Sequence, residues 1–345
     1  MNTVNQSHKA RSEVLRSSSL YLKEFEATEE VNIKAYRLFS GTRIKAVLAP
    51  FMYWTIRHVP MWIALLPIRL LVIVLRLLYV WPSNPFRQSC EYVSQLASEA
   101  GYTHKPKQIY RQLLTNALGT VENYFQLYRD GIESVQDNIE MTSQDADRID
   151  RLAKEFGGVI VMAPHNFASA FSALKMNCIW RLLIITRNSP TIDRTKAALD
   201  FFERMKLTVL MVRGGNPFEL SRTLFAELKK GTVVVATVDS IDHSSQATAR
   251  MFGQNVGFAS WAAKIGAKKK VPIVPSYFRS SDRQVVAVFG EEIVTDNMEV
   301  AMQHYAGFFE QQILEDPASW AYLGDKRWRK LLLKAAESSH NDTNA

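Results

Sequence analysis

The chain has 345 residues, of which 47% are hydrophobic and 22% are charged, as in an ordinary globular protein. Its formal net charge of +8 fits an anionic partner, whether nucleic acid, anionic lipid or an acidic carrier protein. The two cysteines, Cys90 and Cys178, argue against a disulfide framework and against a zinc site built on cysteines. A reducing compartment is the simplest interpretation of this low cysteine content.

The first part of the chain passes from a polar segment to an apolar one. Residues 1–43 are polar and charged, lack the apolar core of a secretory signal peptide, and are expected to be partly disordered. Residues 44–82 are the most apolar stretch, but Pro60 and Pro67 interrupt them. Charged residues also break this stretch before it reaches the length of uninterrupted apolar sequence that a simple transmembrane helix needs.

Cationic and aromatic side chains within residues 44–82 predict where this segment lies. Arg69 and Arg76 share one face of a helix because of their spacing. Tryptophans and tyrosines accompany the apolar body, as they do at membrane interfaces. We therefore expect a pair of helices that anchors the chain in a membrane interface. The alternative is a buried helix pair in a soluble core, which would place several cationic side chains in an apolar interior.

Residues 83–330 are expected to form the main domain. After an all-helical part, short apolar runs begin at Gly158 and alternate with helical segments. Such an alternation predicts an α/β fold whose mostly parallel central sheet is flanked by helices. Residues 331–345 are interpreted as a polar tail whose last part is expected to be disordered. Strands are predicted at 158–164, 182–186, 207–213, 232–238, 271–278 and 284–289, and helices at 197–205, 218–230, 257–267 and 299–314.

The stretch from Gly158 to Phe171 contains the first candidate for chemistry. A buried strand is expected to end at Pro164, and His165 follows just before a helix begins. Ligands of open α/β sheets bind outside the carboxyl ends of the strands, where a neutral histidine can act as a general base. A structural histidine bonded to backbone groups is the alternative. Asp239 follows another predicted strand, either as a carboxylate of the same site or as a helix N-cap.

Further blocks occur in a fixed order around His165. The blocks are an arginine region with Arg187, Pro190 and Asp193, a strand ending in Asp239, the turn Phe252-Gly253, and a C-terminal run with Pro317, Trp320, Arg327 and Trp328. Over about residues 45–330, this order resembles the late lipid A acyltransferases of bacterial inner membranes, the lauroyl and myristoyl transferases. Ser240 stands where that family usually has glutamine.

The resemblance implies a mechanism, and the sequence departs from it at one position. In that family a His-x4-Asp/Glu motif activates an acceptor hydroxyl for attack on an acyl thioester, and the carboxylate orients the imidazole. Counting from His165, the carboxylate position holds Ala170. Three possibilities follow. Asp239 supplies the carboxylate, Ser169 or a backbone carbonyl orients the ring more weakly, or the protein is not a catalyst.

The resemblance also implies substrates and partners. The catalytic residues are expected to be His165 and Asp239, with Arg187, Asn166 and Ser169 in contact with substrate and with no metal ion or bound cofactor. The expected donor is acyl carrier protein or a coenzyme A thioester. The expected acceptor is a hydroxyl of a lipid A-type glycolipid or of another lipid. The expected location is the cytoplasmic face of an inner membrane that contains anionic lipid.

Two other classes of function stay open at this point. A catalytically inactive relative would act as a lipid-binding or assembly protein at the membrane, and Ala170 is the reason to consider it. A nucleic-acid-binding protein fits only the net charge, since the basic residues are dispersed and no nucleic-acid-binding motif occurs. We therefore predict no nucleic-acid partner.

Overall fold

The centre of the protein is a seven-stranded sheet with the strand order β1-β9-β8-β2-β5-β3-β4. The computed structural model describes residues 54–186, 198–199, 201–203, 205–211, 217–241 and 247–342. Neighbouring strands of this sheet run parallel except for β8 and β9, which are antiparallel. This confirms the predicted mostly parallel sheet. The strands are β1 (Ile139–Glu140), β2 (Val159–Ala163), β3 (Leu182–Thr186), β4 (Val209–Met211), β5 (Val233–Thr237), β8 (Ile273–Ser281) and β9 (Gln284–Phe289).

A separate hairpin was not predicted. It consists of β6 (Thr248–Met251) and β7 (Gln254–Gly257), which pair antiparallel outside the main sheet. Phe252 and Gly253 form its two-residue turn with φ values of 51° and 70°. Positive φ at both central residues matches the right-handed twist of the flanking strands. The short, largely polar β7 gave no apolar alternation from which a strand could be predicted.

Alternate residues of the central strands face two different hydrophobic cores. Ile160 and Met162 of β2 pack into one core, whereas Val159 and Val161 pack into the other. Successive side chains of a strand point to opposite faces, so a sheet that is covered on both faces needs apolar residues at every position. This requirement explains the uninterrupted apolar run that ends just before Pro164.

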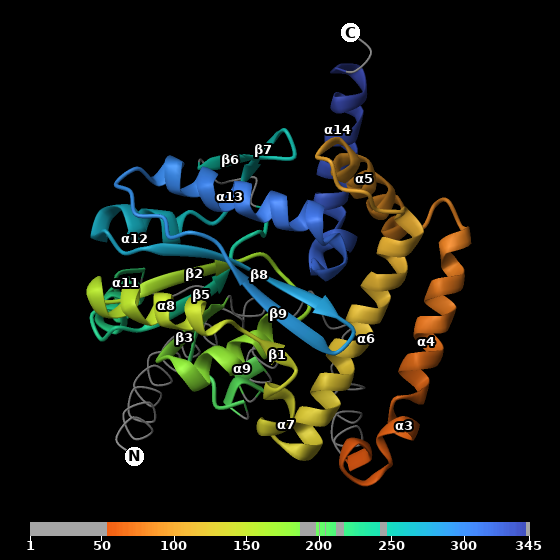
Figure 1. Ribbon diagram of the computed structural model, residues 1–345, viewed down its shortest axis with the longest axis horizontal. Coiled ribbons are helices and arrows are strands. Elements are labelled where there is room, and N and C mark those ends of the chain that lie inside the picture. The colour runs from red at the N-terminus through yellow and green to blue at the C-terminus, as the bar shows by residue number, and fades with distance from the viewer. Residues whose placement is uncertain are drawn as a thin grey trace, which may run out of the picture.

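Helices cover both faces of this sheet (Figure 1). One core takes residues from α11 (Pro217–Leu228), α12 (Trp261–Lys269) and α13 (Met298–Glu315), and the other from α8 (Ser143–Glu155) and α9 (Ser169–Ile179). Residues 198–199 and 201–203, within another predicted helix, are helical as well. The remaining elements after residue 82 are α5 (Pro85–Glu99), α6 (Pro106–Asp130), α7 (Glu133–Gln136), η2 (Pro317–Ser319), η3 (Ala321–Gly324) and α14 (Lys326–Asp342).

Residues 331–342 of the predicted C-terminal tail are helical, so the expected disorder is wrong as far as Asp342, and residues 343–345 lie outside the described residues. Helix α14 continues to Asp342, beyond the expected domain end at residue 330. Its apolar stripe at Leu332, Ala335 and Ala336 is buried, and the Ala336 carbonyl accepts a hydrogen bond of 3.0 Å from Gln95 Nε2 of α5. The apolar spacing of a helix therefore continues past residue 330, and packing against α5 outweighs the polar composition of the last residues.

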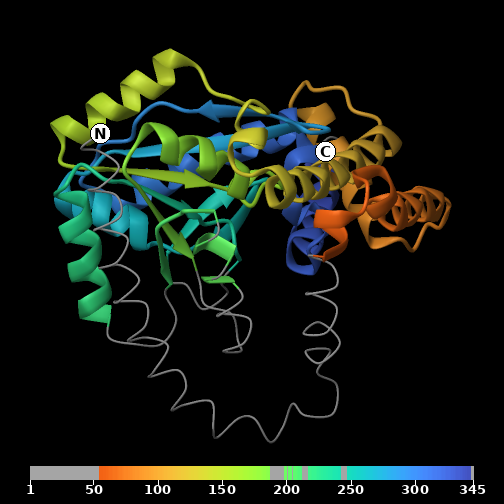
Figure 2. The ribbon, with the colours of Figure 1, turned by 90° about the horizontal axis from the view of Figure 1, so that it is seen from below.

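Residues 54–80 form a broken helical arm on the outside of α6. Residues 54–58 are helical, and α3 (Met61–Ala64), α4 (Leu66–Leu77) and η1 (Leu78–Val80) follow. Pro60 caps the N-terminus of α3 and Pro67 lies in the first turn of α4, so both prolines interrupt the helix as predicted. Figures 1 and 2 both show α4 in orange at the outer edge of the molecule. Residues 1–53 lie outside the described residues.

The two arginines of α4 face inward. Arg69 forms an ion pair of 2.7 Å with Glu122, and Arg76 donates a hydrogen bond of 2.9 Å to Thr115 Oγ1, both on α6. Their shared face confirms the prediction from their spacing. Within the described residues, no single helix is long and apolar enough to cross a membrane. Leu66–Val80 and Pro85–Glu99, bent by 66°, satisfy that criterion of length and composition only as a pair.

Gly119 provides a test of how tightly α6 packs against the sheet. A Cβ atom at this position would lie 2.0 Å from the backbone oxygen of Asp282, in the turn between β8 and β9. We expect Gly119→Ala to destabilise the protein by about 1–3 kcal/mol, because backbone must move to relieve the overlap. Urea unfolding measures this change.

Gly307 in α13 is the matched control for that substitution. A Cβ atom there meets nothing within 4 Å. Gly307→Ala should therefore stabilise the protein by about 0.5–1 kcal/mol through the lower chain entropy of alanine in the unfolded state. Equal effects of the two substitutions would contradict the packing described for α6.

Candidate active site

The register of two neighbouring strands brings His165 and Asp239 together. In the parallel pair β2 and β5, Ala163 lies opposite Thr237. His165 and Asp239 each come two residues after these partners, so both leave the sheet at the same level of its carboxyl edge. A hydrogen bond of 3.1 Å from the Val238 N–H to the Ala163 carbonyl continues the ladder between them. The carboxyl edge of parallel strands is where ligands bind in such folds.

His165 Nδ1 is hydrogen-bonded to the Asp239 carboxylate. The same oxygen, Oδ1, accepts a second hydrogen bond of 3.0 Å from the backbone N–H of His165. An ionised carboxylate is only an acceptor, so the hydrogen bond places the ring proton on Nδ1 and leaves a lone pair on Nε2. The His165 side chain is 31% exposed, whereas Asp239 is fully buried. The pair therefore has the geometry of a general base held by a buried carboxylate.

Two buried tryptophans complete the surroundings of Asp239. Trp320 Nε1 donates a hydrogen bond of 2.8 Å to Oδ2, and Trp328 Nε1 donates one of 2.9 Å to the backbone carbonyl of Asp239. The two indole rings pack edge to face with their centroids 4.9 Å apart. The Trp320 contact to Oδ2 and the His165 contacts to Oδ1 together satisfy both carboxylate oxygens, in an interior where an unpartnered charge would be strongly destabilising.

The exposed edge of His165 faces hydroxyl groups. Thr237 Oγ1 lies 3.1 Å from Nε2, and the Tyr322 hydroxyl lies 3.2 Å from it. The Tyr322 ring stacks on the imidazole with 4.1 Å between centroids, and its hydroxyl lies 3.2 Å from Ser240 Oγ. Burial, followed by the charge of nearby Asp239, raises the pKa of Tyr322 above its usual value even though the Ser240 hydrogen bond lowers it. Tyr322 therefore stays a neutral hydroxyl at physiological pH.

The structure distributes the other predicted site residues differently. Asn166 is buried, and its side chain donates to the Ser319 carbonyl and accepts from the Phe278 N–H. Ser169 Oγ bonds the backbone of Asn166 and closes the turn before α9. Both side chains therefore hold the loop that carries His165, while the imidazole itself bonds Asp239, Thr237 and Tyr322. Arg187 lies outside the described residues.

Ala170 does not contribute to the surroundings of His165. It is the second residue of α9 and packs against the core on the face of the sheet that α8 and α9 cover. The carboxylate that the His-x4-Asp/Glu spacing places at position 170 is thus replaced in space by Asp239. The candidates for orienting the ring were Asp239, Ser169 and a backbone carbonyl, and the structure shows the contact with Asp239.

Sequence reasoning missed the hydroxyls of Thr237 and Tyr322 and the roles of the two tryptophans as donors. Trp320 and Trp328 entered the sequence analysis only as part of the C-terminal run, and both are almost fully buried. A buried indole N–H nevertheless needs an acceptor, and that requirement could have been used as a signal. No comparable local signal points to Tyr322, which reaches His165 through pairing of the chain near Ala321 with the His165 carbonyl.

Residues 100–330 match the family model of the bacterial lipid A biosynthesis acyltransferases. Since this match covers more than half of the chain and includes both His165 and Asp239, the chain belongs to that family. Membership of this family places the protein in the class of lipid A biosynthesis acyltransferases. A search of curated proteins found no match.

The hydrogen bond between Trp320 and Asp239 yields a prediction on stability. Trp320→Phe keeps an aromatic ring, though a smaller one, but leaves Oδ2 of a buried carboxylate without its donor, and we expect the lost hydrogen bond to lower the free energy of unfolding by about 1.5–3 kcal/mol. In the Asp239→Asn background the buried group is neutral, and the same substitution should have a smaller effect. Urea unfolding of the four variants measures this coupling, and equal losses in both backgrounds would contradict it.

Proposed function

We propose that the protein is a membrane-associated O-acyltransferase. It moves a fatty acyl chain from acyl carrier protein, or from coenzyme A, to a hydroxyl of a lipid A-type glycolipid. The observation that carries this proposal is the His165–Asp239 pair at the carboxyl edge of the sheet, in a chain of the lipid A acyltransferase family. The cytoplasmic face of the inner membrane, where thioester donor and lipid acceptor meet, is the proposed location.

In the proposed reaction His165 Nε2 takes the proton of the acceptor hydroxyl. The hydroxyl oxygen attacks the thioester carbonyl carbon and forms a tetrahedral intermediate. The carbon–sulfur bond then breaks, and the imidazolium returns the proton to the leaving sulfur, so that an ester and a free thiol result. Asp239 keeps Nδ1 protonated and stabilises the imidazolium. No covalent enzyme intermediate is required.

The hydroxyls around Nε2 mark where the reacting atoms would lie. Thr237 and Tyr322 place their oxygens 3.1 and 3.2 Å from Nε2, a distance that an acceptor hydroxyl would also need. An incoming hydroxyl would take the place of one of these contacts. A hydroxyl released from Nε2 would then be free to donate to the developing oxyanion of the thioester carbonyl.

The alternative of a catalytically inactive relative was based on the missing carboxylate at position 170. Asp239 bonds His165 Nδ1 and can orient the imidazole as the motif carboxylate was expected to do, which supports the catalytic proposal. We therefore expect Ala170→Glu to give no gain in transfer. A large gain would mean that the Asp239 contact is not the functional one.

Removal of the base tests the proposed reaction. We expect His165→Ala to lower the rate of acyl transfer by at least about 10²-fold, which is the lower end of the contribution of a general base. Mass spectrometry of a lipid A precursor incubated with acyl carrier protein thioester measures the product. His104→Gln is the matched control, because the His104 ring bonds the Leu314 carbonyl and is not among the hydrogen-bond partners of Asp239 in the described part of the chain. Equal rates for His165→Ala and wild type would overturn the mechanism.

The proposed membrane contact is the outer face of α4. Its exposed leucine, isoleucine and valine side chains have exposed fractions of 47–67%: Leu66, Leu70, Leu71, Ile73, Val74 and Leu77. Arg69 and Arg76 point toward α6 instead, so this face carries apolar side chains without those charges. Val80 and Trp81, 77% and 62% exposed, extend the apolar surface. A contiguous apolar surface of this kind is typical of a membrane or protein contact.

Substitution of this face tests the membrane proposal. Leu70→Gln/Leu77→Gln should lower partitioning onto phosphatidylglycerol vesicles by about tenfold or more, because burial of each leucine in lipid is favourable by about 1.5–3 kcal/mol. Sedimentation of the full chain with vesicles measures this. Val286→Gln/Val294→Gln, two substitutions of exposed valines elsewhere, is the control. If both double variants bind as wild type does, α4 is not the contact surface.

A further inference from the structure

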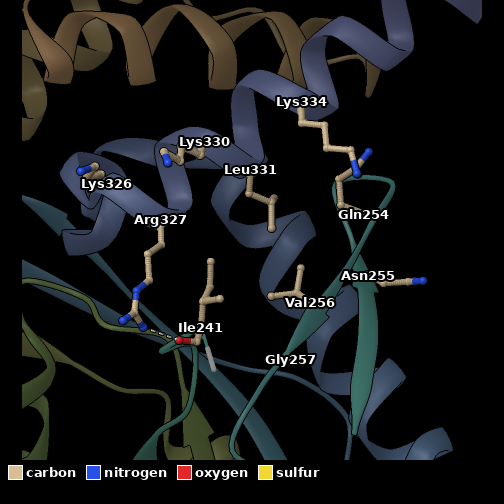
Figure 3. Close-up of a pocket in the computed structure, with 10 residues that line it drawn as sticks. All are labelled: Ile241, Gln254, Asn255, Val256, Gly257, Lys326, Arg327, Lys330, Leu331 and Lys334. Carbon is tan, nitrogen blue, oxygen red and sulfur yellow. Dashed lines mark hydrogen bonds between the residues drawn. The ribbon is translucent and has the colours of Figure 1, made fainter. Parts of the chain in front are cut away.

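A cavity of about 490 Å³ lies between α14 and the β6–β7 hairpin (Figure 3). Its size is in the range of small-molecule sites. Ile241, Val256 and Leu331 give it an apolar lining, and Figure 3 shows these three side chains turned toward the same space. Neither the mechanism nor the membrane contact described above uses this cavity.

Four cations of α14 surround the apolar lining: Lys326, Arg327, Lys330 and Lys334. The three lysines are spaced four residues apart and therefore share one side of the helix. Figure 3 shows Lys334 reaching toward the hairpin at Gln254 and Arg327 extending toward Ile241. The lining includes no aspartate or glutamate. The cavity thus combines an apolar floor with a strongly positive rim.

The position of these cations opposes local helix preferences. Lysine and arginine in the first turns of a helix are disfavoured by the helix dipole, and like charges four residues apart repel each other. Asp325 offsets part of this, since its carboxylate accepts hydrogen bonds from the N–H groups of Arg327 and Trp328. Among the ion pairs of the described residues, none involves the four cations of the rim. A local conflict of this kind is expected where a ligand supplies the compensating charge.

The cavity is fixed to the loop that carries Asp239. Arg327 Nη1 donates a hydrogen bond of 2.7 Å to the carbonyl of Ile241, which lines the cavity. On the next residue, Trp328 Nε1 donates to the carbonyl of Asp239 itself. Ile241 lies two residues beyond Asp239 along the chain. Helix α14 therefore holds its cations at a set position relative to the His165–Asp239 pair.

We propose that this cavity binds the phosphate ester of a substrate that reacts at His165. The inference rests on the proposed acyl transfer. A phosphate monoester or diester matches the lysine and arginine rim. The less polar part of the substrate, next to its phosphate, matches the apolar floor of Ile241, Val256 and Leu331. The phosphopantetheine arm of a thioester donor has this chemistry, and so does a phosphorylated glycolipid acceptor. The shared feature is the phosphate.

Calorimetric titration of the full chain tests the proposal with two matched pairs of probes. 4′-Phosphopantetheine against pantetheine, which differs only in lacking the phosphate, tests a donor phosphate. Glucosamine 1-phosphate against glucosamine tests an acceptor phosphate. We expect the phosphorylated member of at least one pair to bind more tightly to wild type. In Lys330→Gln/Lys334→Gln its Kd should rise about tenfold or more, as loss of charge-assisted contacts predicts, while the phosphate-free member should not change.

Arg329→Gln is the control, because Arg329 lies on the same helix but does not line the cavity. Unchanged thermal unfolding of the lysine variant excludes a folding defect. The proposal is overturned if neither phosphorylated probe binds better than its partner, if Lys330→Gln/Lys334→Gln binds as wild type does, or if Arg329→Gln loses as much affinity. Binding by His165→Ala at wild-type affinity, without any acyl transfer by wild type, would overturn the proposed function and support the cavity.

Discussion

A buried carboxylate is the constraint on which the arrangement of this protein depends. Asp239 is fully buried, and such a charge is tolerated only when its oxygens are fully hydrogen-bonded. The donors come from the loop after β2, through His165, and from the C-terminal segment, through Trp320. One side chain thereby joins parts of the chain that are far apart in sequence, and the same contacts that stabilise the charge orient the imidazole.

The C-terminal segment extends this arrangement from the reaction centre to the neighbouring cavity. Trp320 holds the carboxylate, Tyr322 stacks on the imidazole, and Trp328 bonds the Asp239 carbonyl. Phe252, in the hairpin turn, packs near both tryptophans, with ring centroids 6.3 and 6.2 Å away. The hairpin turn, the segment at Trp320 and the C-terminal helix therefore share one aromatic cluster, which the hydrogen bonds of the two tryptophans join to Asp239. Displacement of any one of these elements would therefore shift the groups that orient His165.

The strands of the central sheet other than β1 could be predicted from the sequence because each contains a local run of apolar residues, as 159–163 does. The meeting of His165 and Asp239 required the register of β2 against β5, which no local pattern specifies. Counting along the chain found only Ala170, since motif spacing cannot detect a carboxylate that arrives from another strand. Neither Tyr322 nor the polar β7 lies in a periodic apolar pattern. The C-terminal helix was not predicted because polar residues dominate its sequence, although Leu332 within it is buried.

The most direct test of the central claim, that buried Asp239 makes His165 the base of an acyl transfer, is the steady-state kinetics of Asp239→Asn. The account predicts that kcat falls by about 10³–10⁴-fold, as when the orienting carboxylate of a catalytic triad is neutralised, while KM for the thioester changes little. A variant that folds like wild type and transfers acyl chains at the wild-type kcat would contradict it.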